Sequence, residues 1–510
     1  MRFTILDCYT DEPAGLGVPP YIGTYPRYVY GAVKEAGDEV NYLTVDDLRA
    51  FVLGKIKDKE NEIKTNIKIR NLSNNFSEIS KILEKTNILI VICGVHTPGK
   101  YLSALPGTTK EVIGLLSQIK NNFLTVLSGP AAHYGSGLWG GRIARDVAKD
   151  FDYFDLVIPD IEFKIVELKE NNFSEDVKVE MDYSVLREKA ILGAEIVKFH
   201  PCFPDFLMAE IETSRGCARK EGCSFCTEPL KYCTVERREV EDIIDEVKTL
   251  ADLGVKNFRL GKQSCFYSYG SAAEIEKLLK GCRQYAEILH IDNVNPIFVD
   301  EEKTKLIVRY CSPGNVAAFG VESFDKEVIR KNKLNSVPEK TFEAIKIINK
   351  YGAVRGSNGL PKFLPGINLI FGLIGESKKT HKENMFWLQK ILDENLMVRR
   401  INVREVVVFP GTLLYKEAGD KFLKKNRKYY FRWRKEIRAK IDNEMLKKVV
   451  PTGNVMKDLR TEIYDGKTTF CRQIGTYPLV VGVKGRLGLD KFVDVKVVGH
   501  QLRSVVGEKI

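Results

Sequence analysis

The hydrophobic residues of the first 165 positions fall into two alternating patterns. Short continuous apolar runs, which are typical of buried strands, lie at residues 3–6, 88–92, 123–127 and 154–158. Apolar residues at helical spacing lie between them, as at residues 26–37 and 109–120. Strands that alternate with helices predict a parallel, doubly wound sheet, and such sheets bind ligands beyond the carboxyl ends of their strands.

The same alternation returns at residue 206 and predicts six further strand–helix units. The predicted strands lie at residues 206–211, 257–260, 289–294, 316–321, 363–371 and 400–408. The helix after the first strand, at residues 237–253, has a strong apolar face. Six such units predict a partial (β/α)6 barrel of the TIM type, with its chemistry at the C-terminal strand ends.

These patterns divide the chain into five segments of α/β class. We predict a Rossmann-like doubly wound domain at 1–165, a connector at 166–205, the barrel at 206–415, a basic helical linker at 416–465 and a small β-rich C-terminal domain at 466–510. The last rests on short apolar runs at residues 479–483, 492–498 and 503–507.

Composition and charge place the protein in a broad class. The 510 residues are 44% hydrophobic and include 11 cysteines, an odd number without the spacing of a secreted disulfide scaffold. The N-terminus begins with a strand-like run rather than a signal peptide, and no apolar run reaches the roughly 18 residues of a membrane span. We expect a cytoplasmic protein without a membrane. The net charge of +11 favours an anionic partner such as RNA, although a solvated lysine-rich surface would give the same value.

Three cysteines follow the first barrel strand at the spacing C-x5-C-x2-C: Cys217, Cys223 and Cys226. Three closely spaced thiolates suit an iron–sulfur cluster with one iron open to a further ligand. Cys233 lies seven residues further on, so four cysteines could instead form a closed structural zinc site. Buried thiols without a metal are the third interpretation. Arg219 and Lys220, between these cysteines, could either tune a cluster or be solvated, and we expect them to be solvated.

The ordered strand ends resemble those of the radical S-adenosylmethionine (SAM) superfamily, whose usual cysteine spacing is C-x3-C-x2-C with an aromatic before the third cysteine. The resemblance is closest to methylthiotransferases and extends over about 210 residues. It implies that the three cysteines bind three irons of a 4Fe-4S cluster, that SAM chelates the fourth iron, and that one electron cleaves SAM to a 5′-deoxyadenosyl radical. It also implies an electron donor such as ferredoxin or flavodoxin. The residues that it assigns to SAM are Phe225, Gly261, Gln263, Glu322, Ser323 and Gly372.

The N-terminal segment resembles the cobalamin-binding-type domain that precedes many radical SAM cores. The D-x-H-x-x-G motif of that family is absent, and His96 has no matching aspartate, so we expect cobalamin only as an alternative. Methylthiotransferases carry a second cluster in this domain; Cys8 and Cys93 lie at comparable strand ends, but we read them as two buried thiols. The glycines of residues 135–141 form a G-x-G-x-x-G pattern that comes too late for a dinucleotide loop.

Two C-terminal features bear on the substrate. One segment places four aromatic residues among lysines and arginines: Tyr429, Tyr430, Phe431 and Trp433. This composition is typical of a surface that binds nucleic acid, and equally of an amphipathic helix that packs on the barrel. Residues 466–507 resemble a TRAM domain, an RNA-binding β-barrel, but the segment at residues 469–478 has no role that we can derive.

Three functional hypotheses follow. The first is methyl or methylthio transfer to RNA, with tRNA as the expected partner. The second is cobalamin-dependent radical methylation of a small molecule, lipid or protein. The third is a non-catalytic nucleic-acid-binding protein with a four-cysteine zinc site.

Overall fold

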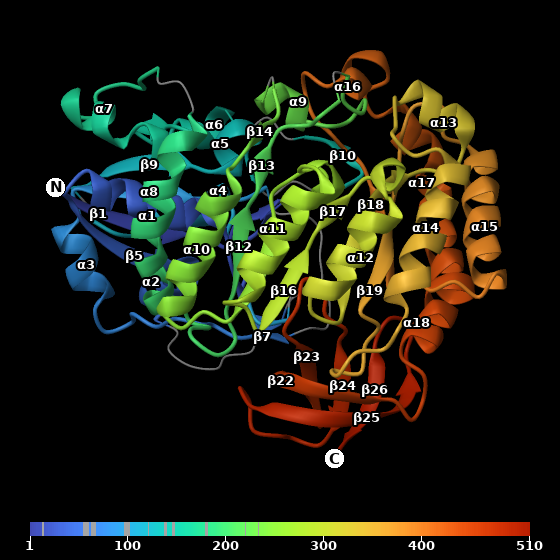
Figure 1. The fold of residues 1–510 in the computed structure, drawn as a ribbon. Coiled ribbons are helices and arrows are strands. Elements are labelled where there is room, and N and C mark those ends of the chain that lie inside the picture. The colour runs from blue at the N-terminus through green and yellow to red at the C-terminus, as the bar shows by residue number, and fades with distance from the viewer. Residues whose placement is uncertain are drawn as a thin grey trace. The chain divides into compact units, whose positions relative to one another are not determined.

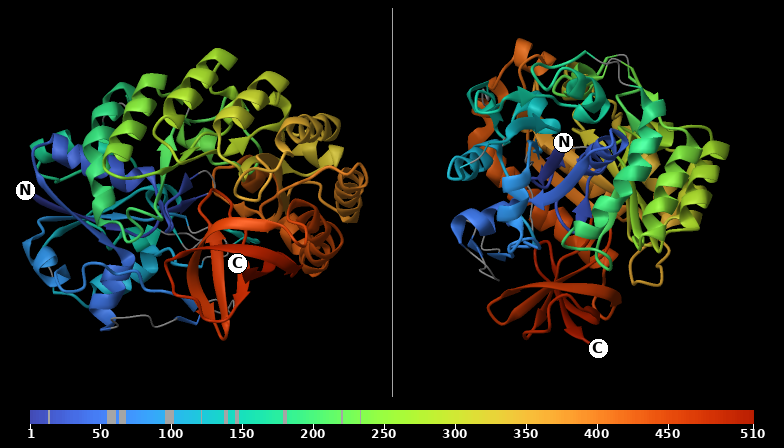
Figure 2. Two further views of the ribbon diagram at one scale, coloured as in Figure 1. Left: turned by 60° about the horizontal axis from the view of Figure 1, so that its bottom comes forward. Right: turned by 90° about the vertical axis from the view of Figure 1, so that its left-hand side faces the viewer.

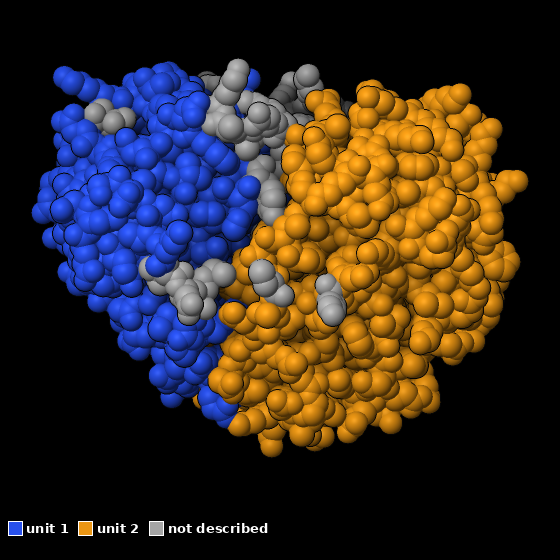
Figure 3. Space-filling model, turned by 90° about the horizontal axis from the view of Figure 1, so that it is seen from above, with its two compact units in different colours: residues 1–139, 145–211, 241–258 blue, residues 140–144, 212–240, 259–510 orange. Residues whose placement is uncertain are grey.

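The computed structural model contains two compact units, which Figure 3 colours separately. Unit 1 comprises residues 1–139, 145–211 and 241–258, and unit 2 comprises residues 140–144, 212–240 and 259–510. The structure describes residues 1–12, 15–54, 61–62, 68–95, 102–120, 122–136, 140–144, 148–178, 182–219, 221–232 and 234–510.

Unit 1 is built on a five-stranded parallel sheet. Its strands are β1 (Arg2–Asp7), β5 (Glu39–Thr44), β8 (Ile88–Ile92), β9 (Leu124–Ser128) and β11 (Leu156–Val157), in the spatial order β11-β9-β8-β1-β5. Numbered along the chain, these five strands follow the order 5-4-3-1-2. This is the flavodoxin-like doubly wound order 2-1-3-4-5, read from the opposite edge of the sheet. The predicted Rossmann-like domain is confirmed. The sequence pattern did not predict β5, because polar residues interrupt its apolar run.

Two apolar clusters pack the helices of this unit. One cluster joins the sheet to α2 (Val45–Leu53), α3 (Ile79–Lys85) and α4 (Thr109–Leu116), with Leu48, Leu83 and Val112 among its buried members. A second cluster joins α1 (Thr24–Glu35) to α8 (Leu186–Gly193) through Tyr28 and Ala190.

Unit 2 contains the barrel strands that carry the sequence motifs. A four-stranded parallel sheet has the order β17 (Asn293–Val294), β18 (Asn315–Glu322), β19 (Phe363–Phe371) and β20 (Arg400–Glu405). β16 (Ile288–Ile291) precedes β17 with a one-residue break. The ends of β12 (Met208–Glu212) and β15 (Asn257–Gly261) also reach this unit, where Thr213 N donates to Gly261 O at 3.3 Å. The six predicted barrel strands are therefore all present.

The barrel strands alternate with helices. These are α11 (Ala272–Arg283), α12 (Glu301–Tyr310), α14 (Pro338–Gly352) and α15 (Lys378–Asp393), which follow one another in Figure 1. Side chains cap several of their N-termini: Ser271 caps α11, Asp300 caps α12 and Ser377 caps α15. These caps satisfy backbone donors in the first turn of each helix, and so fix where the helix begins after its loop.

The C-terminal part of unit 2 is helical and then forms a closed β-barrel. The helices are α17 (Lys421–Ile437) and α18 (Asn443–Val449). The barrel, red in Figure 2, is made of β22 (Val455–Asp465), β23 (Thr468–Gln473), β24 (Val481–Lys484), β25 (Phe492–His500) and β26 (Val505–Lys509), in the order β22-β23-β24-β26-β25.

The predicted helical linker at 416–465 is wrong beyond α18, because β22 begins at Val455. Its ladder shifts register between Met456 and Leu459, so the hydrophobic alternation of an ordinary strand is broken in the sequence. The β module therefore begins about ten residues earlier than its apolar runs suggest.

Candidate active site

The cysteine loop begins at the end of β12 and is closed at its base by two short strands. β13 (Ser214–Arg215) pairs antiparallel with β14 (Glu236–Arg237), so the loop leaves and returns at the same place. A buried ion pair between Arg215 and Glu212 at 2.6 Å supports this base. Cys217, Cys223 and Cys226 lie within the loop and are half-buried.

The middle of the loop is fixed from two sides. Ser224 N donates to Asn332 O at 2.9 Å, and Ser224 Oγ donates to Asn332 Oδ1 at 2.7 Å. On the other side Leu414 N, at the start of α16 (Leu413–Glu417), donates to Ser224 O at 2.8 Å. Asn332 is the C-cap of α13 (Lys326–Lys331), the helix after β18. The C-x2-C segment is thus held by the elements that follow β18 and β20.

The three thiols interact electrostatically. Burial is the largest cause that raises the pKa of Cys223 to about 11 and the pKa of Cys226 to about 12. The Cys217 thiol contributes to both rises. Among the residues that the structure describes, no three histidine, cysteine or carboxylate side chains converge closely enough to hold a metal ion. The donor set nevertheless fits an iron–sulfur cluster, because soft thiolates are the ligands that such clusters take and metal binding itself removes the thiol protons.

Arg219 contacts this thiol set, contrary to the expectation that it is solvated. Its Nη1 lies 3.1 Å from Cys223 Sγ, and its Nη2 donates to Lys333 O at 2.5 Å. The guanidinium lowers the pKa of Cys223, opposing the larger effect of burial. A cation there favours the thiolate that a metal needs. Lys220 and Cys233, the fourth zinc ligand that the sequence allowed, lie outside the described residues.

Phe225 packs at the end of β19. It lies against an apolar cluster that includes Leu373, Val406 and Leu414, together with Ile370. This brings the aromatic of the cysteine loop to the end of the strand that Gly372 follows, another residue that the resemblance assigns to SAM. The assignment of Phe225 to SAM stays a prediction.

The segment after β15 is engaged within the protein. Gln263 is fully buried; its Oε1 accepts a hydrogen bond from Thr213 Oγ1 at 3.2 Å and its Nε2 donates to Leu260 O at 3.1 Å. Lys262, between Gly261 and Gln263, has a positive φ of 63° and is buried. The side chain of Gln263 therefore holds β12 and β15 together, and its assignment to SAM stays a prediction.

Glu322, at the end of β18, is the unusual carboxylate of this site. It has a positive φ of 61°, and its Oε2 is buried without a hydrogen-bond partner. Burial raises the pKa of Glu322 to about 8, and the Arg404 guanidinium opposes this rise. Its charge also raises the pKa of Cys223, so the carboxyl and the thiol lie near each other. A buried polar atom without a partner is the feature expected where a ligand binds.

Two other predicted residues lie in capping turns. Ser323 Oγ accepts from Asp325 N at 3.1 Å and so shapes the turn before α13. Gly372 N donates to Glu376 Oε2 at 2.5 Å, and Asn426 Nδ2 of α17 donates to Glu376 Oε1 at 3.0 Å. Burial raises the pKa of Glu376 to about 8. The turn after β19 is thus closed by a buried carboxyl that the sequence did not single out.

The glycine-rich segment before residue 142 is explained by a close backbone approach. β10 (Arg142–Ile143) pairs with β21 (Val407–Val408), and Gly141 N donates to Val406 O at 2.9 Å. A Cβ at Gly140 would lie 2.6 Å from Glu405 O, and Gly141 has a positive φ of 84°. These two glycines allow β10 to pair with β21, which is a structural reason for the pattern.

The strand ends of unit 1 bring Cys8 and Cys93 together. They follow the adjacent strands β1 and β8, and Cys8 N donates to Ile92 O at 3.0 Å. Burial raises the pKa of the Cys8 thiol well above its ordinary value, and the Cys93 thiol raises it further. Both are fully buried, and His96 lies outside the described residues.

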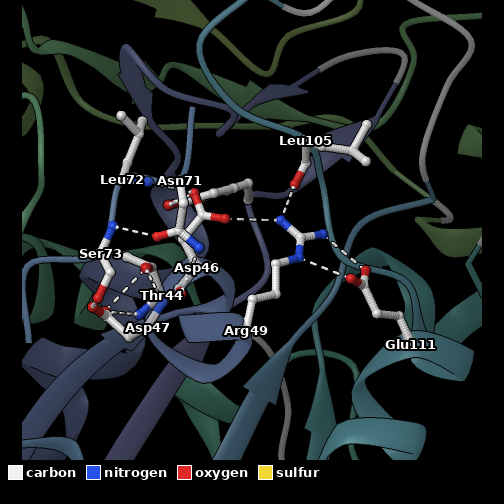
Figure 4. Close-up of polar contacts among 10 residues, drawn as sticks. Thr44, Asp46, Asp47, Arg49, Asn71, Leu72, Ser73, Leu105 and Glu111 are labelled. Atoms are coloured by element: carbon white, nitrogen blue, oxygen red, sulfur yellow. Dashed lines mark hydrogen bonds and ion pairs between the residues drawn. The ribbon is translucent and has the colours of Figure 1, made fainter. Parts of the chain in front are cut away.

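The charged cluster beside β5 satisfies itself (Figure 4). Arg49 donates to Glu111 through two hydrogen bonds of 2.8 Å and to Asp46 at 3.0 Å. Asp47 accepts from Ser73 Oγ at 2.7 Å. Because each charge has a partner, this cluster holds α2 against the loop that follows it and needs no ligand.

The aromatic residues of α17 divide between the core and the surface. Tyr430 and Trp433 are buried against Phe371, as the amphipathic interpretation requires. Phe431 is 62% exposed, and Tyr429 stacks on Trp433 with the ammonium groups of Lys378 and Lys428 about 5 Å from its ring. The outward face of α17, meaning its exposed surface on both sides of the buried Tyr430 and Trp433, is therefore basic and aromatic, with Tyr429 and Phe431 on opposite sides of it.

Known proteins match this site and the chain around it. The sequence profile of the radical SAM superfamily matches residues 211–388, which include the three cysteines and Glu322. An uncharacterized protein of Methanocaldococcus jannaschii is 44% identical over 540 aligned residues, which cover 100% of this chain and 93% of that protein. One from Archaeoglobus fulgidus is 38% identical and covers 99% of this chain and 89% of its own length.

More distant matches have described activities. The ribosomal protein uS12 methylthiotransferase RimO of Nitratiruptor sp. is 24% identical, over 66% of this chain and 70% of RimO. The structure of the radical SAM methyltransferase TsrM of Kitasatospora setae, with tryptophan and a SAM analogue bound, aligns with a TM-score of 0.50. That alignment covers 79% of this chain and 72% of TsrM at 14% identity, so it is evidence for the fold alone.

Proposed function

This chain belongs to the radical SAM superfamily, and from that premise we propose that it transfers a methyl or methylthio group to RNA, with tRNA as the expected substrate. Membership makes the non-catalytic zinc hypothesis wrong. Among the described residues, no helix has both the length and the apolar character of a membrane span.

The superfamily implies a 4Fe-4S cluster and SAM, and we expect the residues assigned from the sequence to hold them. Cys217, Cys223 and Cys226 would bind the cluster, and the strand ends at Glu322 and Gly372 would receive SAM. When bound, these two cofactors supply the radical. The chain itself holds the cysteine loop through Ser224 and positions a cation at Cys223.

The outward face of α17 carries the RNA proposal. Phe431 is 62% exposed for stacking, and Tyr429 lies beneath the ammonium groups of two lysines. Exposed aromatics with surrounding cations bind single-stranded nucleic acid through stacking and phosphate contacts. The small C-terminal barrel, which resembles a TRAM domain, supports the same proposal.

One experiment tests the chemistry. After anaerobic reconstitution with iron and sulfide, we expect about four irons per chain, as one cluster requires, and reductive cleavage of SAM. Cys223→Ala should lose both, whereas the control Cys311→Ala, which alters a buried cysteine after α12, should keep both. Equal losses in the two variants would contradict the assignment of the loop.

A second experiment tests the substrate. Binding of unmodified tRNA should weaken steeply with salt and should weaken further in Lys428→Glu and Phe431→Ala. The matched control is Lys305→Glu on α12, whose side chain is also exposed. Mass spectrometry of tRNA nucleosides from cells without the protein should reveal one missing methyl or methylthio modification; an unchanged nucleoside profile would refute RNA as the substrate.

A second candidate function is radical methylation or methylthiolation of a protein, which the match to a uS12 methylthiotransferase favours. A cobalamin-dependent form of that reaction would act on a small molecule, lipid or protein. The strand order of the unit 1 sheet supports it, because the order reverses between β1 and β8, and doubly wound sheets bind ligands at such a point. The missing D-x-H-x-x-G motif weighs against it. Corrinoid analysis of the purified protein separates the two forms.

A further inference from the structure

The inner face of β20 is polar along its whole length. Arg400, Asn402 and Arg404 are half-buried and alternate with Ile401 and Val403, which are almost fully buried. Because successive side chains of a strand point to opposite faces, the polar three share one face and the apolar two the other. Asn402 lies in register with Asn368 of β19, and their amides are 3.2 Å apart. This face continues toward Glu322, whose pKa the Arg404 guanidinium lowers.

Both arginines of this face lack a carboxylate partner. Among the described residues, neither Arg400 nor Arg404 has a carboxylate oxygen within 4 Å. Other arginines of unit 2 with little exposure do form ion pairs, as Arg215, Arg460 and Arg472 show. Arg404 Nε lies 2.6 Å from the Asn402 amide, whose oxygen accepts from it. The nearby Glu322 carboxyl has a pKa of about 8 because of burial, so near neutral pH it gives little compensating charge.

The C-terminal barrel supplies the floor beneath Arg400. Tyr477, from the loop between β23 and β24, lies under the guanidinium, 4.3 Å from its ring centre. Its backbone is fixed by Arg399 Nη2, which donates to Tyr477 O at 2.6 Å, and Thr476 N donates to His290 Nδ1 at 3.1 Å. Within the segment at residues 469–478, whose role the sequence alone left unassigned, the residues up to Gln473 belong to β23 and Tyr477 contacts Arg400.

The one carboxylate at this floor is already paired. Asp292 accepts a hydrogen bond from Tyr477 Oη and forms a buried ion pair with Arg259. Its charge acts on Arg400 only at a distance, where it raises the pKa of the guanidinium, because its oxygens are paired with Tyr477 and Arg259. Burial and the neighbouring Arg404 both lower the pKa of Arg400, which is the expected effect of two like charges in a poorly solvated place.

We propose that Arg400 and Arg404 form a binding site for an oxyanion group of the substrate, a carboxylate or a phosphate, with Tyr477 as its floor. Two neighbouring, half-buried guanidinium groups without a carboxylate partner are costly unless an anion pairs with them, and a guanidinium binds such groups through two parallel hydrogen bonds. The amides of Asn368 and Asn402 add neutral donors. The inference rests on the proposed function only in taking the barrel interior as the place where the substrate binds.

The test uses the full-length protein and two simple anions. Thermal unfolding is measured during titration with sodium phosphate and, separately, with sodium acetate, each against sodium chloride at matched ionic strength. We expect a saturable rise in melting temperature for at least one anion, and the anion that acts at the lower concentration identifies the group. In Arg404→Gln the affinity should fall by about 10- to 100-fold, the value of one or two charge-assisted hydrogen bonds.

Two controls make the result decisive. Arg309→Gln removes a cation of α12 that is 70% exposed and should leave the anion affinity unchanged, while Asn402→Ala provides a second site variant should Arg404→Gln fail to fold. A wild-type protein without a saturable shift, or site variants with wild-type affinity, would overturn the proposal. It would also be overturned if S-adenosylhomocysteine displaced the anion, because the site would then belong to the cofactor carboxylate. Since no turnover is measured, failure of RNA modification would leave this result intact.

Discussion

Replacing Asn332 with alanine should release the cysteine loop from the barrel. Asn332 Oδ1 accepts from Ser224 Oγ at 2.7 Å and from Ile374 N at 3.1 Å, and its Nδ2 donates to Ile374 O at 2.9 Å. Asn332 is fully buried and Ser224 nearly so. The variant leaves up to three buried polar groups without a partner, at about 1–3 kcal/mol each, so we expect a loss of about 3–5 kcal/mol in the free energy of unfolding.

Asn349 provides a matched control. Its Nδ2 donates to Ile345 O at 2.9 Å and to Met397 O at 3.0 Å, and its Oδ1 accepts from Met397 N at 2.7 Å. Asn332 makes the same bonds apart from the one to Ser224, since its Nδ2 also donates to Val328 O, four residues earlier in the chain. Asn349 belongs to α14 and bonds to the loop before β20. Asn349→Ala should therefore cost a similar free energy of unfolding, without touching the cysteine loop.

The assay compares stability with metal content. Guanidinium unfolding gives the free energy of each variant, and iron and sulfide are measured after anaerobic reconstitution at a temperature where both variants are folded. We expect Asn332→Ala to hold markedly less iron than the wild type and Asn349→Ala to hold the wild-type amount. The reasoning is refuted if folded Asn332→Ala keeps its full iron content, or if both variants lose iron equally.

Three further predictions concern other parts of the chain. Gly141→Ala should destabilise by about 1–2 kcal/mol, because its φ is positive and a Cβ would lie 2.9 Å from Glu405 Oε2, whereas Gly114→Ala in α4, with open space around it, should stabilise by about 0.5–1 kcal/mol; denaturant unfolding checks both. The native pKa of Glu376 is about 8 and its ordinary value is 4.5, so the native state keeps a proton that the unfolded chain releases. Stability relative to Glu376→Gln should therefore fall by about 1.4 kcal/mol per pH unit as the pH rises between these values, and a pH-independent difference would contradict it. Cys8→Ala and Cys93→Ala should reconstitute with the iron content of the wild type; a lower content would instead indicate a second metal site in unit 1.

Local sequence patterns were sufficient for the order of strands and for the cysteine loop. A buried parallel strand needs a continuous apolar run, and a loop that holds a cluster needs closely spaced thiols, so both leave a mark within ten or so residues. β22 and β5 were missed because their alternation is interrupted, in β22 by register shifts and in β5 by polar residues. One available signal was overlooked: the pattern R-I-N-V-R at residues 400–404 already implies a strand with one polar face.

What the sequence by itself determined is the chemistry that the chain carries, because three thiols and an ordered set of strand ends are properties of neighbouring residues. Only the tertiary structure decided which distant residues complete the site. Asn332 lies 108 positions from Ser224, and Tyr477 lies 185 positions from Asp292. The partner of a buried polar group is set by packing, so no local pattern shows that Arg219 contacts Cys223 or that Tyr477 lies beneath Arg400.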